Sequence, residues 1–573
     1  MAQAQALAMR LPSWRRRWLL IGLMSMSAML LGRSVYLQAV HRDFLQHKGD
    51  QRYSRTISLF AHRGMITDRN KEPLAISTPV ESVWASPADV EITPQLTKKM
   101  ANLLKVKPAD INKKLKNDDK EFVYLKRRMS PEDAARVMQL GIPGVFLQRE
   151  YRRFYPEGDN AAHLIGFTGV DDHGQEGVEL VYQNWLAGKQ GSRRVIKDRQ
   201  GHIVEDLEAV KVPQEGRDLV LSIDRRIQYL AHRELAKAIE INKAKAGGIV
   251  VIDARTGEVL ALANQPTYNP NHPVNIAGKS RNRAIVDTFE PGSTLKPFTI
   301  AAVLENGSFK PDTMINTGNG KLNIGPATIS DSHPAGIISV AQVIQKSSNV
   351  GAAKMALTLR PQAMWGMFNQ VGFGSTAHVG FPGEASGRLR PWQHWRPIEQ
   401  ATMSYGHGIS LSLMQLARAY TVFANDGELK PISLVRIKDA PIGQHVFSAQ
   451  TAHEVRDMLE LVVQAGGTAP MAQVAGYRVA GKTGTAHKLV GGKYAENLYV
   501  SSFIGMAPAS NPRLIIAVMV DEPSAGQYYG GAVAAPVFRE VMAGALRILS
   551  VPQDAAGKTI EPGGAFPEVK ESV

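Results

Sequence analysis

A serine and a lysine three positions apart, Ser293 and Lys296, are of types that could together perform covalent chemistry. They follow a turn at Pro291 and Gly292, and a helix is predicted from Ser293 to Leu304. Positions i and i+3 of a helix share a face, with Cβ atoms roughly 5–6 Å apart, so Lys296 could reach the Ser293 hydroxyl. A serine hydroxyl needs an adjacent base, and a desolvated lysine near other cations can act as one. The pair predicts a serine nucleophile at a helix start, where backbone N–H groups could stabilise an anion.

A second polar group is formed by Ser347, Ser348 and Asn349. It lies between a predicted helix at 338–345 and another that begins near Val350. The Ser347 hydroxyl could relay a proton, and the Asn349 amide could hold a substrate carbonyl. Serine and asparagine are also favoured at helix N-caps, so a capping role is the alternative for these residues.

A third group is the run Lys482, Thr483, Gly484 and Thr485. Small residues and a glycine in a strand let another backbone approach closely, and an edge strand could pair with an extended peptide. The lysine charge and the two threonine hydroxyls are suited to binding a carboxylate. An ordinary turn with glycine is the alternative.

The elements that must position these groups form an α+β domain, which we predict to span residues 216–551. A strand is expected at 217–223, an amphipathic helix at 227–241, and a hairpin of strands at 246–252 and 259–263. Further strands are expected near 499–522. Strands that follow a helix, with long helical stretches later, favour an antiparallel sheet covered by helices.

The N-terminus predicts a membrane anchor at residues 18–40. Residues 1–17 contain four arginines and no acid, and residues 18–32 carry no charge. Arg33 can snorkel outward while residues 34–40 complete the span, and the arginine cluster should stay in the cytoplasm. A cleaved signal peptide is the alternative, but no clean small-x-small cleavage site follows the apolar core. In both cases the remaining chain is exported, which excludes nucleic acid as a partner.

Composition narrows the chemistry further. The chain has no cysteine, so a disulfide scaffold, a thiolate metal site and a cysteine nucleophile are excluded. Its formal net charge of +15 suits an anionic partner without identifying one. Residues 41–215 are charged and rich in turns, for example in the segments 61–70, 152–156 and 174–179, and we expect structural turns and buried ion pairs there. Residues 552–573 are expected to be a disordered tail.

The ordered set of Ser-x-x-Lys, Ser-x-Asn and Lys-Thr-Gly resembles the signature of penicillin-binding proteins and class A β-lactamases. The chain is most similar to class B penicillin-binding proteins, of the division-specific (septal) peptidoglycan transpeptidase type of Gram-negative bacteria. The block 289–298, the segment 62–70 and the segment 174–179 all carry this resemblance. Two departures, Thr483 in place of the commoner serine and Leu295 in place of valine, keep the chemistry.

The resemblance implies a cytoplasmic tail (1–17), an anchor (18–40), a pedestal (41–215) and a transpeptidase domain of the penicillin-binding fold (216–551). By this resemblance, Ser293 attacks the carbonyl between the last two D-alanines of a stem peptide. Lys296 serves as the base, and Ser347 relays a proton to the leaving amine with help from Lys482. An amine of a neighbouring stem then resolves the acyl-enzyme into a cross-link.

The resemblance also implies the substrate contacts. Asn349 positions the acyl-side amide, Thr483 and Thr485 hold the terminal carboxylate beside Gly484, and the backbone N–H groups of Ser293 and Thr485 form the oxyanion hole. Loops that line the cleft in this family include Tyr405, Tyr528 and Tyr529, for which packing is the alternative role. His407 is expected to be structural.

No metal or organic cofactor is expected. The resemblance implies several partners: peptidoglycan stem peptides, the lipid-linked precursor, β-lactam antibiotics, a membrane glycan polymerase and other division proteins. It implies a single-pass protein of the inner membrane with its catalytic domain in the periplasm.

A β-lactamase or carboxypeptidase of the same fold is one alternative, although a class A β-lactamase would lack a pedestal and an anchor. An elongation-type transpeptidase is a second alternative, with the same chemistry in another cellular machine. A mainly scaffolding division protein is a third, and the presence of all three motifs argues against a dead enzyme.

Overall fold

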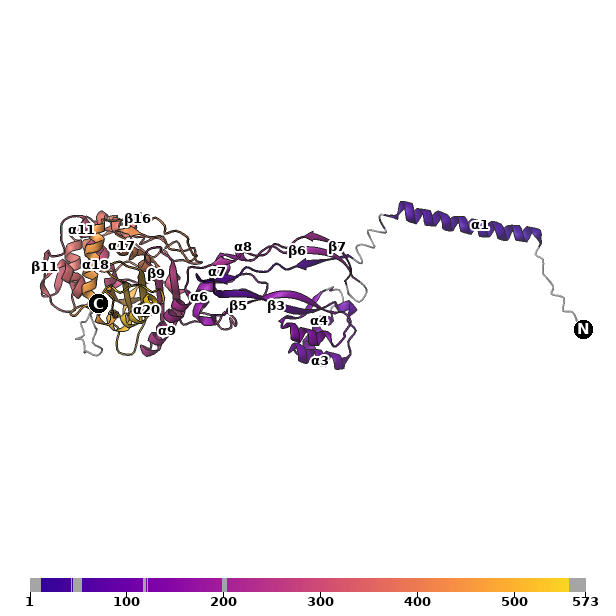
Figure 1. Cartoon of the computed structure of the whole chain (residues 1–573), viewed down its shortest axis with the longest axis horizontal. Helices are drawn as coiled ribbons and strands as arrows, with labels where there is room; N and C mark the ends of the chain where they lie inside the picture. The colour runs from indigo at the N-terminus through magenta and orange to yellow at the C-terminus, as the bar shows by residue number, and fades with distance from the viewer. Residues whose placement is uncertain are drawn as a thin grey trace, which may run out of the picture. The chain divides into compact units, whose positions relative to one another are not determined.

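The computed structural model describes residues 12–42, 44, 54–116, 120, 122–197 and 203–555 (Figure 1). The chain forms two compact units, each assembled from segments that are distant in sequence. The first unit takes residues up to 61, 79–150 and 189–214, and the second takes 62–78, 151–188 and 215 onward. Of the predicted tail at 552–573, residues 556–573 lie outside the described residues.

The N-terminal segment is one continuous helix. It consists of α1 (Ser13–Val35) and a π-helical turn at Tyr36–Val40, and none of its side chains is buried. The span Ser13–Val40 has 28 residues and is apolar enough to cross a membrane by length and composition. At 1.5 Å per residue it would measure about 42 Å, which exceeds the hydrocarbon core of a bilayer. Within the part of the chain that the structure describes, this is the helix suited to serve as a membrane anchor.

The first unit contains two groups of strands and a small helical cluster. Strands β1 (Ser54–Leu59), β6 (Gly191–Lys197) and β7 (Ile203–Lys211) form an antiparallel sheet in the order β1-β6-β7. Strand β4 (Val123–Met129) pairs with β3 (Pro73–Ala85), which in turn pairs with β5 (Val145–Phe154). Of these two longer strands, residues 79–85 and 145–150 belong to the first unit. Apolar residues of β3–β5 pack with three helices, α3 (Pro94–Leu104), α4 (Pro108–Leu115) and α5 (Pro131–Met138).

The second unit is built on an antiparallel sheet of five strands in the order β10-β9-β19-β18-β17. Their bounds are Val259–Gln265, Ala246–Asp253, Leu514–Asp521, Lys493–Ala507 and Ala480–Val490. The predicted hairpin at 246–252 and 259–263 is confirmed as β9 and β10. The predicted strand at 217–223 is shorter than expected, because only Leu219–Val220 (β8) joins a ladder, in parallel to β2 (Ile66–Thr67).

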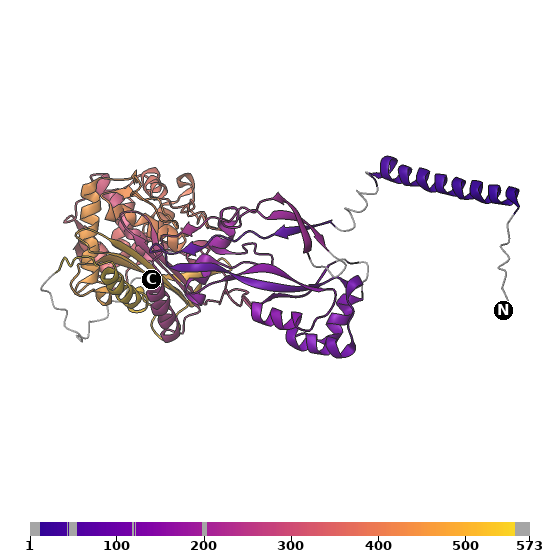
Figure 2. The same ribbon diagram turned by 45° about the vertical axis from the view of Figure 1, so that its right-hand side comes forward.

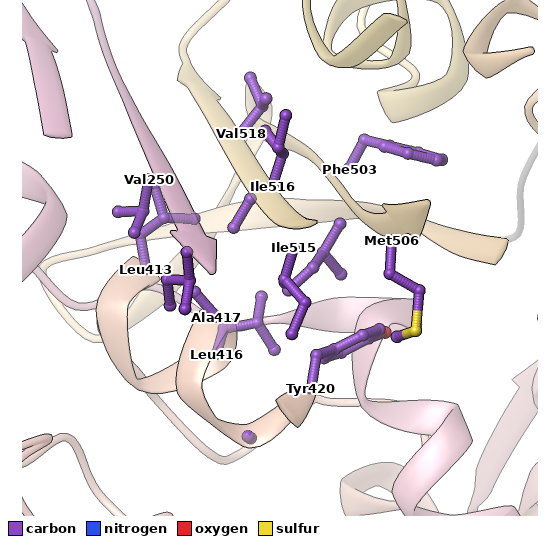
Figure 3. Packing of buried hydrophobic residues seen from close by; sticks show 14 of the residues in the cluster. Val250, Leu413, Leu416, Ala417, Tyr420, Phe503, Met506, Ile515, Ile516 and Val518 are labelled. Atoms are coloured by element: carbon purple, nitrogen blue, oxygen red, sulfur yellow. The ribbon is translucent and has the colours of Figure 1, made fainter. Parts of the chain in front are cut away.

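Helices cover both faces of this sheet, which explains why β9 is buried along its whole length. A Cβ added at Gly247 would meet Leu235 and Ile239 of α9 (Arg225–Ile241), whereas one at Gly248 would meet Leu413 of α16 (Leu413–Ala419). Successive residues of a strand point to opposite faces, so α9 and α16 lie on opposite sides. Figure 3 shows the α16 side, where Leu416 packs near Ile515 while Ile516 and Val518 point away.

Helix α20 (Ala535–Ile548) lies next to α9. Their contact is tight, since a Cβ at Gly544 would come within 2.3 Å of Leu230. The magenta α9 and the yellow α20 remain neighbours in both views (Figure 1 and Figure 2). The predicted helix at 227–241 is thus confirmed, and its apolar stripe is buried against the sheet and α20.

Smaller elements complete the second unit. The helices nearest the three sequence motifs are α11 (Lys296–Glu305), α12 (Val340–Lys346), α13 (Asn349–Ala356) and α18 (Ala449–Val463). The others are α6 (Ala162–Ile165), α7 (Gly177–Val181), α8 (Gln183–Leu186), α10 (Arg283–Val286), α14 (Pro361–Gln370), α15 (Pro397–Met403), α17 (Thr421–Ala424) and α19 (Gly530–Val533). Short strands are β11 (Met314–Gly318), β12 (Lys321–Ile324), β13 (Ala327–Ser330), β14 (Gly336–Ser339), β15 (Glu428–Leu429) and β16 (Gln444–His445).

The turns and ion pairs expected around Arg63 and Glu179 are confirmed within the second unit. Glu179, fully buried, lies 2.6 Å from Arg63 Nη2 and accepts a hydrogen bond from Arg153 Nε at 2.6 Å. Arg63 also donates to the Glu179 carbonyl at 2.9 Å. Asp68 holds the turn at residues 68–72, because its carboxylate accepts hydrogen bonds from the backbone N–H groups of Asn70 and Glu72. These charges tie distant segments of one unit together.

Candidate active site

The predicted Ser-x-x-Lys pair meets as expected, although the helix start differs from the prediction. Residues Gly292–Leu295 form a 3₁₀ turn, and α11 begins only at Lys296. In a 3₁₀ turn side chains at i and i+3 are eclipsed, which brings Lys296 directly over Ser293. Lys296 Nζ donates to Ser293 Oγ at 2.9 Å, and both residues are buried.

Ser347 sits between α12 and α13 in a left-handed conformation, with φ 60° and ψ 39°. Such a conformation costs a non-glycine residue roughly 1–2 kcal/mol, so the surrounding contacts must hold it. Lys296 Nζ donates both to the Ser347 carbonyl, at 2.5 Å, and to Ser347 Oγ, at 3.1 Å. The unusual backbone thus presents two oxygens of one residue to the same ammonium group.

Lys482 is a second lysine that contacts Ser347. It lies on β17, the edge strand of the sheet, and its Nζ donates to Ser347 Oγ at 2.9 Å and to Thr483 Oγ1 at 3.2 Å. Ser293, Lys296, Ser347 and Lys482 therefore form one continuous hydrogen-bonded chain. The three sequence motifs lie on three separate elements, and the fold brings them within hydrogen-bond reach.

Glycines allow this close assembly. A Cβ at Gly484 would lie 2.5 Å from Ser502 Oγ and 2.7 Å from the Pro291 carbonyl, so only glycine lets β17 pass the 3₁₀ turn this closely. Gly406 has φ +89°, and its Cβ would come within 2.2 Å of the Gly292 carbonyl. Strand β17 and the loop at Gly406 both contact the turn that carries Ser293.

The hydroxyl groups of Thr483 and Thr485 each form a hydrogen bond with another segment of the chain. Thr468 and Thr483 share a hydrogen bond of 2.8 Å between their Oγ1 atoms, and both side chains are buried. The Gly530 N–H donates to Thr485 Oγ1 at 3.0 Å. Sequence reasoning missed Thr468, whose only local signal is the preceding glycine pair.

Asn349 opens α13 with an unsatisfied acceptor. Its Nδ2 donates to the Ser330 carbonyl at 3.3 Å, while its buried Oδ1 has no hydrogen-bond partner among the described residues. The capping role foreseen for this motif belongs to Ser348, whose Oγ accepts from the Gly351 N–H and donates to Asp331 at 2.6 Å. Asp331, which sequence reasoning missed, also accepts from the Val350 N–H at 2.9 Å.

The three predicted tyrosines occupy different surroundings. Tyr405 is buried in a small apolar cluster, where desolvation raises the pKa of its hydroxyl to about 12. Tyr528 stacks on Tyr499 at a centroid distance of 4.1 Å and lies 4.4 Å from the Tyr529 ring. Both half-buried tyrosines immediately precede Gly530, which contacts Thr485.

Two titratable groups flank the nucleophile turn. Glu290 accepts from the Gly408 N–H at 2.9 Å and from the Tyr494 hydroxyl at 3.0 Å, and burial raises the pKa of its carboxyl. Burial, and then the charge of Lys296, lower the pKa of His407 to about 4. His407 is therefore neutral at neutral pH. Sequence reasoning singled out His407 but not the role of Glu290 in holding the loop at Gly408.

Comparison with known proteins identifies the class to which this fold and site belong. Residues 247–543 match the family described as penicillin binding protein transpeptidase domain, and residues 58–221 match the penicillin-binding protein dimerisation domain. The mixed α+β fold agrees with a solved transpeptidase domain of penicillin-binding protein 3 from Burkholderia pseudomallei, which is 50% identical with a TM-score of 0.55. That likeness covers 58% of this chain and 97% of the solved one.

Curated relatives extend the match to nearly the whole chain. A probable peptidoglycan D,D-transpeptidase PenA of Neisseria gonorrhoeae is 45% identical over 542 residues, covering 94% of this chain and 93% of that protein. The peptidoglycan D,D-transpeptidase FtsI of Escherichia coli is 40% identical over 554 residues, covering 95% and 93%. The chain belongs to the penicillin-binding protein transpeptidases of the FtsI and PenA type. This confirms the resemblance found in the motifs.

Proposed function

We propose that the protein is a peptidoglycan D,D-transpeptidase that cross-links stem peptides through an acyl-enzyme on Ser293. The observation that carries the proposal is the hydrogen-bonded chain from Ser293 through Lys296 and Ser347 to Lys482. It joins a nucleophile to a proton acceptor and a proton relay, which are the groups that acyl transfer needs.

In the acylation step, Lys296 in its neutral form takes the proton of Ser293 as Oγ attacks the carbonyl between the two terminal D-alanines. The carbonyl oxygen becomes an oxyanion, which the backbone N–H groups of Ser293 and Thr485 stabilise. The C–N bond then breaks, and the leaving amine takes a proton through Ser347 and Lys482. D-alanine departs, and its former partner remains as an ester on Ser293.

Substrate contacts follow from the groups around this chain. Thr483 and Thr485 offer hydroxyls to the terminal carboxylate, with Lys482 adding positive charge. Asn349 Oδ1 lacks a donor, and a buried unpaired acceptor costs about 1–3 kcal/mol. An amide N–H on the acyl side of the substrate would remove that cost. Tyr528 and Tyr529 would pack against the substrate beside Gly530.

In the second half-reaction, the amine of a neighbouring stem peptide attacks the ester carbonyl. It loses a proton to the lysine–serine relay, a new peptide bond forms, and Ser293 Oγ regains its proton. The same geometry would accept a β-lactam, whose ring amide takes the place of the terminal peptide bond and whose opened ring stays attached to Ser293.

The cellular setting of this reaction is also a proposal. The arginine-rich side of Ser13–Val40 would stay in the cytoplasm, placing the catalytic unit in the periplasm. There it would act in septal cell-wall synthesis with a membrane glycan polymerase and other division proteins. Because the chain has no cysteine, one cysteine introduced at exposed Ser510 would report the side of the membrane through an impermeant thiol reagent.

The test of function uses the full-length protein and a fluorescent penicillin. Wild type and Ser308→Ala, which alters an exposed serine beyond the end of α11, should each form a stable one-to-one adduct by intact mass. Ser293→Ala should form none. Rapid loss of the label from wild type would indicate a hydrolase, and the absence of an adduct on every variant would leave only a scaffolding role.

A further inference from the structure

A cavity of about 750 Å³ opens beside the nucleophile turn, within the second unit. It is lined by four chain segments, within residues 281–290, 388–390, 408–410 and 486–489, by Lys245, and by side chains of β18 and β19. Two of these segments lead directly from the site described above. Glu290 lies three residues before Ser293, and Ala486 follows Thr485.

The proposed function fixes which part of a donor peptide would reach this cavity. Its terminal carboxylate would lie toward Thr483, and its scissile carbonyl would lie at Ser293 and Thr485. A peptide placed this way along the edge strand β17 runs antiparallel to it. The residues that precede the two D-alanines would therefore pass Ala486 and His487 and enter the cavity.

The cavity wall has an excess of positive charge. Six cationic side chains line it, against three acidic ones. Two of the acids are already paired with lining cations, since Asp287 accepts from Arg283 at 2.9 Å and Asp521 accepts from Lys488 at 2.7 Å. The third, Glu290, is held by Gly408 and Tyr494 at the end nearest the nucleophile.

Arg388 is the cation that remains available. Its backbone is fixed by paired hydrogen bonds with Ser410, at 2.8 and 3.1 Å. Its exposed side chain has no ion-pair or hydrogen-bond partner in the part of the chain that the structure describes. Arg390, by contrast, is paired with Glu399 at 2.9 Å. Ser410 lies two residues beyond Gly408, so the segment 408–410 contacts Glu290 through Gly408 and the Arg388 backbone through Ser410.

We propose that this cavity binds a carboxylate of the donor peptide that lies upstream of its two terminal D-alanines, with Arg388 as the residue that holds it. This rests on the proposed function, because that function sets the direction of the peptide. A guanidinium group matches a carboxylate with two parallel hydrogen bonds, so the contact selects donors by charge and geometry. Glu290 repels an anion at the nucleophile end, which favours a position of the carboxylate away from that end.

The test uses the full-length protein and two synthetic thioester donors that are identical except that the upstream carboxylate of one is amidated in the other. Wild type should use the carboxylate donor about tenfold more efficiently, as expected for a charge-assisted hydrogen bond near solvent. Arg388→Gln should bring the kcat/KM ratio of the two donors close to one. It should leave turnover of the amidated donor and labelling by penicillin unchanged.

A matched control is Arg255→Gln, which removes an exposed arginine outside the cavity and should retain the wild-type preference. Equal use of the two donors by wild type would overturn the proposal, as would an unchanged preference in Arg388→Gln or an equal loss with both donors. Failure of wild type to bind penicillin would instead overturn the proposed function. Added salt should weaken the preference, since the contact lies near solvent.

Discussion

Two buried clusters of charged residues in the second unit use their hydrogen bonds in opposite ways. In the first, Arg63 and Arg153 both donate to the carboxylate of Glu179. In the second, Lys296 and Lys482 both donate to the neutral hydroxyl of Ser347. Paired guanidinium and carboxylate groups keep their charge states and fix the positions of their side chains. Amino groups that share one hydroxyl can instead exchange protons with it.

Buried charge therefore has two uses in this fold. The arginine cluster ties together segments around residues 63, 153 and 179, which are far apart in sequence. The lysine cluster lies where three motifs meet, and its contacts are to groups that must change partners during a reaction. Substitutions in the first should therefore affect stability, and substitutions in the second should affect rate.

We expect the greatest change in the rate of acylation. Lys296→Met keeps the length of the buried side chain but removes the proton acceptor beside Ser293. The rate of acylation by penicillin should fall about 10³-fold, the size of a general-base contribution. The free energy of unfolding should change much less than the rate, because removing the buried amino group also removes the cost of burying it. Stopped-flow labelling gives the rate, and urea unfolding gives the stability.

Lys310→Met is the matched control, because Lys310 is exposed and lies beyond the C-terminal end of α11. It should acylate at the wild-type rate. If Lys296→Met acylated normally, the assignment of the base would be wrong. If Lys296→Met failed to fold, the lysine cluster would stabilise the fold as the arginine cluster does, and the distinction between the two clusters would be wrong.

The second effect is on stability. Glu179→Gln leaves two buried guanidinium groups without their carboxylate, and breaking a buried ion pair from one side costs about 3–5 kcal/mol. Urea unfolding should show this loss, while the acylation rate of the molecules that remain folded should stay near that of wild type. Glu240→Gln, at an exposed position of α9, should change neither quantity. An unaltered unfolding curve for Glu179→Gln would refute the structural role.

Much of the site could be predicted from sequence because each motif is local. The i, i+3 spacing predicted the contact of Lys296 with Ser293, and the small residues around Gly484 predicted a strand that another backbone approaches. The alternation and periodicity of residues 227–263 predicted α9, β9 and β10. These features depend only on neighbours in the chain, so local rules suffice.

The remaining features depend on contacts across long sequence separations. No local pattern shows that Thr468 supports Thr483, that Asp331 caps α13, or that Arg63 meets Glu179. The left-handed backbone of Ser347 is imposed by its contacts with two lysines and by the end of α12, and serine is not a residue that signals such a conformation. Tertiary packing decides these features.

A third prediction tests how finely the site is positioned. Thr468→Val removes the hydroxyl that orients Thr483 but keeps the side-chain shape. A neutral hydrogen bond contributes about 0.5–1.5 kcal/mol, so acylation by penicillin should slow by about two- to tenfold. The methyl ester of the same penicillin, which lacks the carboxylate, should lose no rate. Thr468→Ser should behave as wild type, and an equal loss with both compounds would indicate a general packing defect.

The smallest effect concerns protons held by the scaffold. Burial lowers the pKa of His163 to about 4, and its Nε2 donates to the Lys279 carbonyl at 2.7 Å. A histidine in the unfolded chain has a pKa near 6.5, so below that pH protons favour the unfolded state. The stability from this site is complete above pH 6.5 and is lost as the pH falls toward 4. The slope is at most about 1.4 kcal/mol per pH unit for one proton.

Urea unfolding between pH 7 and pH 4.5 measures this slope. His163→Gln keeps an N–H donor without a titrating ring, so it should reduce the loss of stability on acidification. His272→Gln, at an exposed position, should leave the slope as in wild type. Because His163 titrates in the scaffold, its substitution should not move the pH profile of acylation. A shift in that profile would mean that His163 and the lysine cluster exchange protons, which would contradict the assignment of His163 to the scaffold.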